Sequence, residues 1–333
     1  MAQKSRIPLS ILDLAVVTEG STAREAIQRS RNLAQQAEKL GYHRFWMAEH
    51  HNMEHVASSA TSVLLGHIAE ATESIRIGSG GIMLPNHSPL IIAEQFGTLA
   101  TMYPGRVDLG LGRAPGTDQV TANAIRPDRM QQTHQFPEHV VQIQRYLSAE
   151  NKTSAVRAFP GEGTNVPIWI LGSSTDSAYL AAELGLPYAF ASHFAPQQIM
   201  SALEIYRERF KASGQLDRPY FMPCVNVILA ETDAEGEYLA TSMYQMFMGV
   251  VTGARAPLRP PVDSMEGIWN EHIQYAIERM LAASFIGSAE TVQTGLNDFL
   301  RNTKSDELMV STYIYDHNLR LKSYQMLMGL DLG

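Results

Sequence analysis

Short apolar runs alternate with segments of helical spacing along most of the chain. Between residues 22 and 40, for example, apolar side chains recur at intervals of three and four, and Gly41 ends the pattern. That spacing predicts an amphipathic helix with a glycine stop. The apolar runs show little alternation of apolar and polar residues, which is typical of strands in a parallel sheet that helices cover.

This alternation predicts eight strands and the helices that follow them. The strands are expected at residues 7–14, 42–48, 75–81, 106–111, 166–171, 188–191, 222–230 and 307–311. The helices are expected at residues 22–40, 59–71, 91–102, 136–147, 177–184, 197–211, 234–248, 289–301 and 319–328. Eight strands followed by helices are the α/β pattern of a (β/α)8 TIM barrel. An open, doubly wound sheet shares this pattern, so only the motifs can distinguish the barrel from the open sheet.

Two long segments interrupt the pattern. Residues 114–129 follow the fourth strand, and the proline-rich residues 252–269 follow the helix after the seventh. Long irregular segments in a compact domain are commonly lids or binding loops. We therefore expect a single barrel domain over residues 1–333 that carries two candidate lids as insertion loops.

Composition narrows the class of protein and its partners. The 333 residues are 45% hydrophobic and 18% charged, as in globular proteins, and the net charge of −8 disfavours binding to nucleic acid or to an anionic membrane. Cys224, the single cysteine, lies in an apolar run where a buried structural role is expected. One thiol and an N-terminus without an apolar leader favour the cytoplasm.

Polar residues are densest directly after the second predicted strand, in the segment AEHHN. It contains Glu49, His50, His51 and Asn52. A histidine at a barrel mouth can act as a general acid or base, whereas a hydrogen-bonded strand end is the plainer interpretation. Adjacent residues of a strand point to opposite faces, so His50 and His51 are poorly placed to share one metal ion.

The third and fourth predicted strands end in glycine-rich segments. Gly80 and Gly81 would let the backbone approach a flat ligand closely, although a β-bulge explains them as well. His87 lies between two prolines and is as suited to fixing that loop as to catalysis. Arg113, at the end of the fourth strand, is either a phosphate partner or a surface arginine. The segment does not match a dinucleotide fingerprint.

Small residues open the helix after the fifth strand, in the segment GSSTDS. They are Gly172, Ser173, Ser174, Thr175 and Ser177. Unpaired N–H groups at a helix start form an anion site together with such hydroxyls, whereas a plain N-cap needs only one hydroxyl. A phosphate site is therefore favoured.

Two later segments suggest no ligand. Residues 285–292 (FIGSAETV) have the pattern of an ordinary capped helix start. His193, in the segment ASHFAP, has no role that the sequence can assign.

Four motifs resemble the bacterial luciferase-like flavin monooxygenase family. Between residues 43 and 191 they read FWMAEHH, IGSGGIMLPNHSP, AEQFGTLATMYPGRVDLGLGR and WILGSSTDSAYLAAELGLPYAF. Each motif alone is weak, but four in the same order are specific. The resemblance implies the barrel, and within the family the chain looks like the short, single-subunit bacterial members.

The same resemblance assigns residues around a flavin ring. It places Glu49 near the ring, His50 at the position of the catalytic histidine, and a non-proline cis peptide at Gly80–Gly81 under the ring. Luciferase itself has a reactive cysteine where this chain has Gly112, which leaves more room and gives no reason to expect light emission.

For the cofactor phosphate, the resemblance implies contacts from Arg113, Ser174 and Ser177. Ser173 holds the place of a family glutamate, and Arg129 is a candidate second phosphate arginine. Together with Gly172, these residues form the expected phosphate end of the site.

The resemblance implies a monooxygenase that uses reduced FMN and oxygen on a small organic substrate, with His50 as general acid/base. A separate flavin reductase would supply the reduced FMN, because no nicotinamide motif is visible. A homodimer is expected through the helices at residues 59–71 and 91–102.

Three alternatives stay open. The same barrel could bind the deazaflavin F420 and transfer hydride, or could bind flavin without catalysis. A metal-dependent hydrolase that uses His50, His51 and His87 is the remaining possibility. The favoured prediction, however, is that the protein has no metal site.

Overall fold

The computed structural model describes residues 7–333, and nine β-strands lie within them. They are β1 (Leu9–Asp13), β2 (Arg44–Met47), β3 (Arg76–Met83), β4 (Val107–Gly112), β5 (Ile168–Gly172), β6 (Tyr188–Phe190), β7 (Phe221–Leu229), β8 (Ser284–Gly287) and β9 (Leu308–Ser311). Each of the eight predicted strands corresponds to one of these, with its ends shifted by one or two residues at most.

Eight of the strands close into a parallel barrel. Their order around it is β1-β2-β3-β4-β5-β6-β7-β9, and β9 closes the ring by pairing with β1. The prediction of a TIM barrel is therefore confirmed, and the open sheet is excluded.

The additional strand, β8, corrects the sequence-based expectation. The helix expected within residues 285–292 does begin at Ala289, but a short strand precedes it. β7 is nine residues long and pairs with β9 through residues 224–226 and with β8 through residues 226–229. β8 thus supplies backbone partners for the end of β7 that extends beyond β9, where free N–H and C=O groups would be costly.

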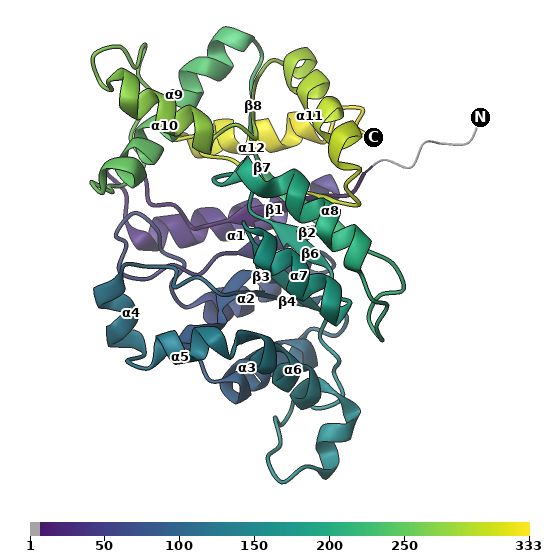
Figure 1. Cartoon of the computed structure of the whole chain (residues 1–333). Helices are drawn as coiled ribbons and strands as arrows, with labels where there is room; N and C mark the ends of the chain where they lie inside the picture. Colours follow the sequence, from purple (N-terminus) through teal and green to yellow (C-terminus); the bar gives the residue numbers. More distant parts are fainter. Residues whose placement is uncertain (1–6) are drawn as a thin grey trace, which may run out of the picture.

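Helices surround the strands (Figure 1). They are α1 (Ala23–Leu40), α2 (Thr61–Glu70), α3 (Pro89–Met102), α4 (Gln119–Ile125), α5 (Arg129–His134), α6 (Phe136–Leu147), α7 (Thr175–Leu184), α8 (Ile199–Arg209), α9 (Asp233–Thr252), α10 (Glu271–Met280), α11 (Ala289–Thr303) and α12 (His317–Leu327). Three short 3-10 helices are η1 (Leu84–Asn86), η2 (Ala149–Thr153) and η3 (Pro196–Gln198). None of the helices within residues 7–333 has the length and apolar character needed to cross a bilayer.

Three helices differ from the sequence-based expectation. The segment 114–129 was expected to be irregular but contains α4, which Asp118 caps by accepting from the backbone N–H of Thr121. α5 and α10 were not predicted, and α10 begins at a side-chain cap from Asn270. All three are additional to the strand–helix repeat, so the alternation that predicts the barrel gives no reason to expect them.

Local chemistry explains why α1 forms where the sequence predicts it. Thr22 and Glu25 make a reciprocal capping box, which satisfies backbone N–H groups at the helix start. Gly41 ends the helix in a left-handed conformation with φ of 87°, which favours glycine. The buried face is made of small and apolar residues, so α1 packs closely on the strands.

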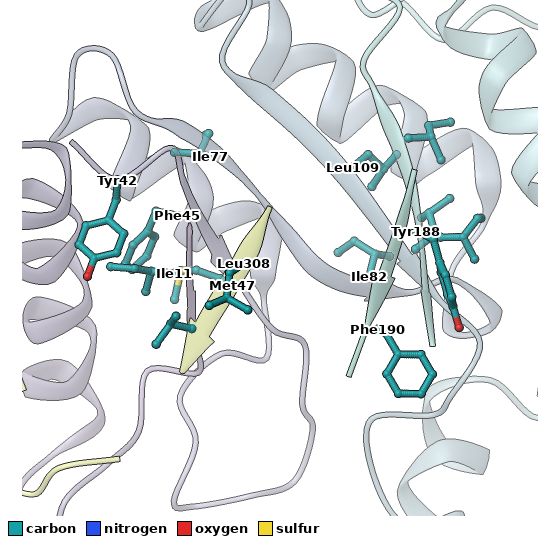
Figure 2. Packing of buried hydrophobic residues seen from close by; sticks show 14 of the residues in the cluster. Ile11, Tyr42, Phe45, Met47, Ile77, Ile82, Leu109, Tyr188, Phe190 and Leu308 are labelled. Carbon is teal, nitrogen blue, oxygen red and sulfur yellow. The ribbon is translucent and has the colours of Figure 1, made fainter. Parts of the chain in front are cut away.

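The strands carry two different cores on their two faces. Along β2, Phe45 and Met47 point outward into the layer between strands and helices, with Ile11 and Leu308 from neighbouring strands (Figure 2). Trp46 points into the barrel, where an inner core includes Trp169 from β5. The inward positions of β2 are thus its even-numbered residues.

Charged residues fill the end of the barrel at which the strands begin. Arg44 donates to Asp108 at 2.6 Å and to Glu307 at 3.0 Å, and Arg76 donates to Asp108 at 3.2 Å. Tyr220 donates to Glu307 at 2.8 Å. Both carboxylates are fully buried, so their stability depends on these partners. At this end of a TIM barrel such a network stabilises the fold and takes no part in chemistry.

We expect Asp108→Asn to lower the free energy of unfolding by about 3–5 kcal/mol, because it removes a buried charge that two guanidinium groups need. Urea unfolding at neutral pH measures the change. Glu183→Gln is the control, since it breaks an exposed pair with Lys211 and should have little effect. Equal losses in the two variants would contradict a structural role for the interior network.

Candidate active site

The side chains that follow β2 continue its alternation. Trp46 faces the barrel interior, and the same parity directs His50 toward the barrel mouth. Glu49 and His51 point the other way, where they hydrogen-bond to each other at 2.8 Å. His50 is not among the residues that meet at the Glu49 carboxylate, which agrees with the expectation that His50 and His51 point apart.

Glu49 lies at the centre of a buried hydrogen-bond cluster. His51 and His87 each place Nε2 within 2.8 to 3.0 Å of its carboxylate, and the backbone N–H of Met83 donates at 3.1 Å. Asn86 lies at the edge of the cluster, 3.4 Å from the carboxylate. Glu49 thus fixes the loops after β2 and β3 to each other.

Burial alone would raise the pKa of Glu49, but the hydrogen bonds from His51, His87 and Met83 lower it to about 2. The carboxylate is therefore ionised at neutral pH and is a strong acceptor. Its role in this arrangement is to hold the loops in place.

Glu49, His51 and His87 are also the described residues that could hold a metal ion. Their contacts are hydrogen bonds of 2.8 to 3.0 Å. Ligand atoms around a tetrahedral zinc ion are about 3.3 Å apart, as follows from Zn–ligand distances of about 2.0 Å. His50 is not part of the group, which removes one of the three histidines on which the metal-hydrolase alternative depended.

His50 has the surroundings of a neutral acid/base group. Its Nδ1 atom is buried and has no hydrogen-bond partner within residues 7–333. Burial lowers the pKa of His50 to about 4, and His55 and Arg255 act in the same direction. The imidazole is therefore neutral at physiological pH, with one nitrogen that can donate and one that can accept.

The Gly80–Gly81 peptide bond is cis, as the resemblance implied. The register of β3 against β4 also shifts between Ser79 and Ile82, so the bulge that the sequence left open is present too. A β-carbon at Gly81 would lie 2.8 Å from the carbonyl oxygen of Gly110. Close packing of the strands therefore requires glycine here, whether or not a ligand binds.

Gly112 does not leave the room that the sequence comparison suggested. A β-carbon there would lie 3.2 Å from the sulfur atom of Met83. The flexible thioether fills this space, so the smaller residue at position 112 does not enlarge the site.

The structure brings Arg113 and the start of α7 together. Arg113 donates to Asp176 at 3.0 Å, and both side chains are exposed. Ser174 is the N-cap of α7, yet its hydroxyl makes no capping hydrogen bond. The hydroxyl of Ser173 also has no partner within residues 7–333. A guanidinium and two hydroxyls at a helix start can bind a phosphate.

Ser177 and Gly172 lie beside these groups but are already engaged. The Ser177 hydroxyl donates to the carbonyl oxygen of Ser174 at 2.7 Å and hydrogen-bonds the Tyr188 hydroxyl at 2.8 Å. A β-carbon at Gly172 would meet the Ser177 hydroxyl. Their geometry is explained by packing, and a direct phosphate contact would have to displace these bonds.

Arg129 has a structural role that the sequence did not indicate. It donates to the side chain of Asn86 at 3.0 Å and to the carbonyl oxygen of Arg113 at 2.8 Å. It thus connects the Glu49 cluster to the phosphate end of the site. Asn86 was missed as a site residue, although the sequence places it with His87 in a rigid loop between two prolines.

Both candidate lids are packed onto the barrel mouth. In residues 114–129, Gly116 accepts from the backbone N–H of His51 at 3.1 Å, and Arg126 donates to the carbonyl oxygen of His87 at 2.6 Å. In residues 252–269, Leu258 is buried and exchanges backbone hydrogen bonds with Val17 and Glu19. The first segment thus contacts the loops after β2 and β3, and the second contacts the loop after β1.

The sequence profile of the luciferase-like monooxygenase family matches residues 7–304. The chain belongs to this family. A luciferase-like monooxygenase of Escherichia coli K12 is 50% identical over 324 residues, which are 97% of each chain. N-acetyl-S-alkylcysteine monooxygenase of Bacillus subtilis is 33% identical over 96% of this chain and 97% of its own.

Solved structures with the same fold agree with this assignment. The crystal structure of apo-MsnO8 is 33% identical, with a TM-score of 0.86 over 97% of this chain and 98% of that one. Two structures at 16% identity show the fold alone. The oxygenating component of 3,6-diketocamphane monooxygenase from Pseudomonas putida, in complex with FMN, has a TM-score of 0.73 over 98% and 97% of the chains. An F420-dependent secondary alcohol dehydrogenase has a TM-score of 0.65 over 96% of this chain and 97% of its own.

We expect Glu49 to make the protein sensitive to acid. Its pKa falls from the ordinary value of 4.5 to about 2, so its stabilising effect is complete above pH 4.5 and is lost as the pH falls toward 2. The shift corresponds to about 3 kcal/mol of unfolding free energy. Urea unfolding from pH 7 to pH 2 should show this loss in the native chain and a smaller one in Glu49→Gln. An equal loss of unfolding free energy at low pH in both proteins would contradict this role of Glu49.

Proposed function

We propose that this family member is an FMN-dependent monooxygenase that uses reduced FMN and oxygen on a small organic substrate, with His50 as general acid/base. The family supports an oxygenase in general. One observation carries the finer proposal: His50 is neutral, faces the barrel mouth and has a buried Nδ1 without a partner within residues 7–333. When bound, reduced flavin supplies the chemistry that activates oxygen.

The residues around the mouth fit the cofactor. The flat Gly80–Gly81 segment offers backbone without side chains to a planar ring, and Glu49 holds the adjoining loops rigid. Arg113, Ser173 and Ser174 would bind the phosphate.

Two existing contacts at the phosphate end would have to adjust. Asp176 currently pairs with Arg113, and the backbone N–H of Thr175 is bonded to the side chain of Gln198 at 3.2 Å. Gly172 and Ser177 stay part of the proposed cofactor site as the packing that shapes this turn.

His50 would move a proton to or from the reacting group. A neutral imidazole can accept a proton at one nitrogen, and its low pKa keeps it neutral throughout the physiological range. The loops 114–129 and 252–269 would help to exclude water from this group.

Coenzyme F420 is the second candidate cofactor, because a barrel of the same fold is an F420-dependent dehydrogenase. The names of the relatives favour oxygenation over hydride transfer. The 33% identity to the N-acetyl-S-alkylcysteine enzyme makes thioethers of that kind one substrate class to try. A separate reductase as source of reduced FMN, and a cytoplasmic location, complete the proposal.

One pair of variants separates binding from chemistry. We expect Arg113→Ala to weaken FMN binding about 5- to 100-fold while leaving riboflavin binding unchanged, because riboflavin has no phosphate. His50→Gln should bind FMN normally but should form about 100- to 10,000-fold less oxygenated product. Fluorescence titration measures binding, and mass spectrometry of products formed under ¹⁸O₂ from aldehydes and N-acetyl-S-alkylcysteines measures oxygen transfer.

His272→Ala, at an exposed histidine, is the control for the His50 variant. Label in the product matters because free reduced flavin consumes oxygen without any enzyme. Full product formation by His50→Gln would sink the acid/base role. Tighter binding of F420 than of FMN would favour hydride transfer.

We also propose a homodimer through α2 and α3. Val63, Ile91 and Met102 are exposed large hydrophobic residues on these helices, with 69%, 46% and 59% of their surfaces accessible. Exposed apolar groups on neighbouring helices commonly mark an interface. Light scattering should give twice the mass of one chain, and Met102→Glu should shift it toward the monomer. Met200→Glu, on α8, is the control, and a monomeric native chain would contradict the proposal.

A further inference from the structure

Three polar residues lie together at the barrel mouth: Asn226, His193 and His50. The site described so far gives Asn226 and His193 no role, and it uses His50 only as an acid/base group. Asn226 lies on β7, where Met222 and Cys224 face the barrel interior, so the same parity directs Asn226 inward. His193 lies in the turn after β6, on the opposite side of the barrel from His50, which follows β2. His193 and Asn226 are both buried.

The contacts of Asn226 fix the orientation of its amide. The carbonyl oxygen of His193 can only accept, so the amide nitrogen must face it, and the two are 2.6 Å apart. The same nitrogen donates to the Ser284 hydroxyl at 3.0 Å. Both N–H groups are thus used, and the amide oxygen is left as a pure acceptor.

Each of the three residues has one buried polar atom without a partner within residues 7–333. These atoms are Oδ1 of Asn226, Nδ1 of His193 and Nδ1 of His50. Buried polar atoms are nearly always paired, and leaving several unpaired in one region is costly. Other residues also have such atoms, but these three residues interact with one another, because Asn226 donates to His193 and the electrostatic effect of His50 reaches His193. Three such atoms that lie near one another at the mouth point to a polar ligand.

We propose that Asn226 and His193 form a neutral hydrogen-bonding subsite that recognises an N–H group next to a carbonyl, as in an imide or amide. This inference rests on the proposed function and deepens it. Asn226 would accept from the ligand N–H, and His193 would donate to the neighbouring carbonyl.

The surroundings favour an uncharged ligand group. Burial, with a smaller effect from His50, lowers the pKa of His193 to about 3, so its ring is neutral and supplies no charge to pair with a carboxylate. Asn226 is neutral as well. A buried charged group without an opposite charge would be strongly disfavoured here.

Two ligands of the proposed reaction can offer this chemistry. The ring of FMN carries an N–H group between two carbonyls at one edge, and β7 lies across the barrel from β3 with its Gly80–Gly81 segment. An N-acetylated substrate carries an amide N–H. The shared chemistry is an N–H donor beside a carbonyl, and the experiment has one arm for each source.

The first arm compares oxidised FMN with 3-methyl-FMN, in which a methyl group replaces the ring N–H. If the flavin is the source, the native chain should bind FMN about 5- to 100-fold more tightly. Asn226→Ala removes the acceptor and makes room for the methyl group, so the two affinities should come within about 2-fold. His193→Phe keeps the ring shape and the backbone carbonyl but cannot donate to the ligand carbonyl, which both flavins carry, so it should weaken the binding of both and leave the preference in place.

The second arm is decisive if the native chain binds both flavins equally. It measures, on FMN-loaded protein by calorimetry, the binding of N-acetyl-S-methylcysteine and of its N-methylated derivative. The native chain should prefer the first compound and Asn226→Ala should not. Asn302→Ala, at an exposed position of α11, is the matched control in both arms, and thermal melting checks that every variant folds.

Two results would overturn the subsite. In the first, the native chain binds FMN and 3-methyl-FMN equally and also binds the two cysteine derivatives equally. In the second, Asn226→Ala prefers the N–H compound of a pair as strongly as the native chain does. Failure of the native chain to bind FMN at all is a different result, since it would overturn the proposed function and this inference with it.

Discussion

The buried carboxylate of Glu49 is the contact on which the rest of the barrel mouth depends. It is ionised, almost inaccessible, and hydrogen-bonded to the loops that follow β2 and β3. A charge in such a place persists only if every partner stays in position, so the cluster fixes both loops. Because His50 directly follows Glu49 in the chain, the same contact sets the direction in which His50 points.

The interior of the barrel changes character along its axis. Where the strands begin, charged side chains such as Arg44 and Asp108 fill the interior and satisfy one another's hydrogen bonds. Aromatic side chains occupy the middle, including Trp46 and Trp169. At the mouth the polar groups that face inward, His50, His193 and Asn226, are neutral, and each has an atom without a partner within residues 7–333. A saturated end stabilises the fold, whereas an unsaturated end is suited to a ligand, which matches the division of labour in TIM barrels.

The sequence predicted much of the fold and part of the candidate site. The strand positions followed from apolar runs, and the divergence of His50 and His51 followed from strand parity. The cis peptide at Gly80–Gly81 came from family resemblance and could not have come from spacing. The sequence also suggested phosphate contacts for Ser177, but it gave no sign that this hydroxyl is held by Tyr188.

The order of the chain by itself determined the barrel, because apolar periodicity and strand length are local properties that neighbouring residues record. It also placed polar residues at strand ends, where a barrel gathers them. Only the tertiary structure decided which of those residues meet. Arg129 joins Asn86, and Asn226 turns its amide toward the backbone of His193. Such contacts join residues that are 33 or 43 positions apart. They depend on the closure of the barrel and on which acceptor each hydrogen-bond donor finds there. Neither leaves a local pattern in the sequence.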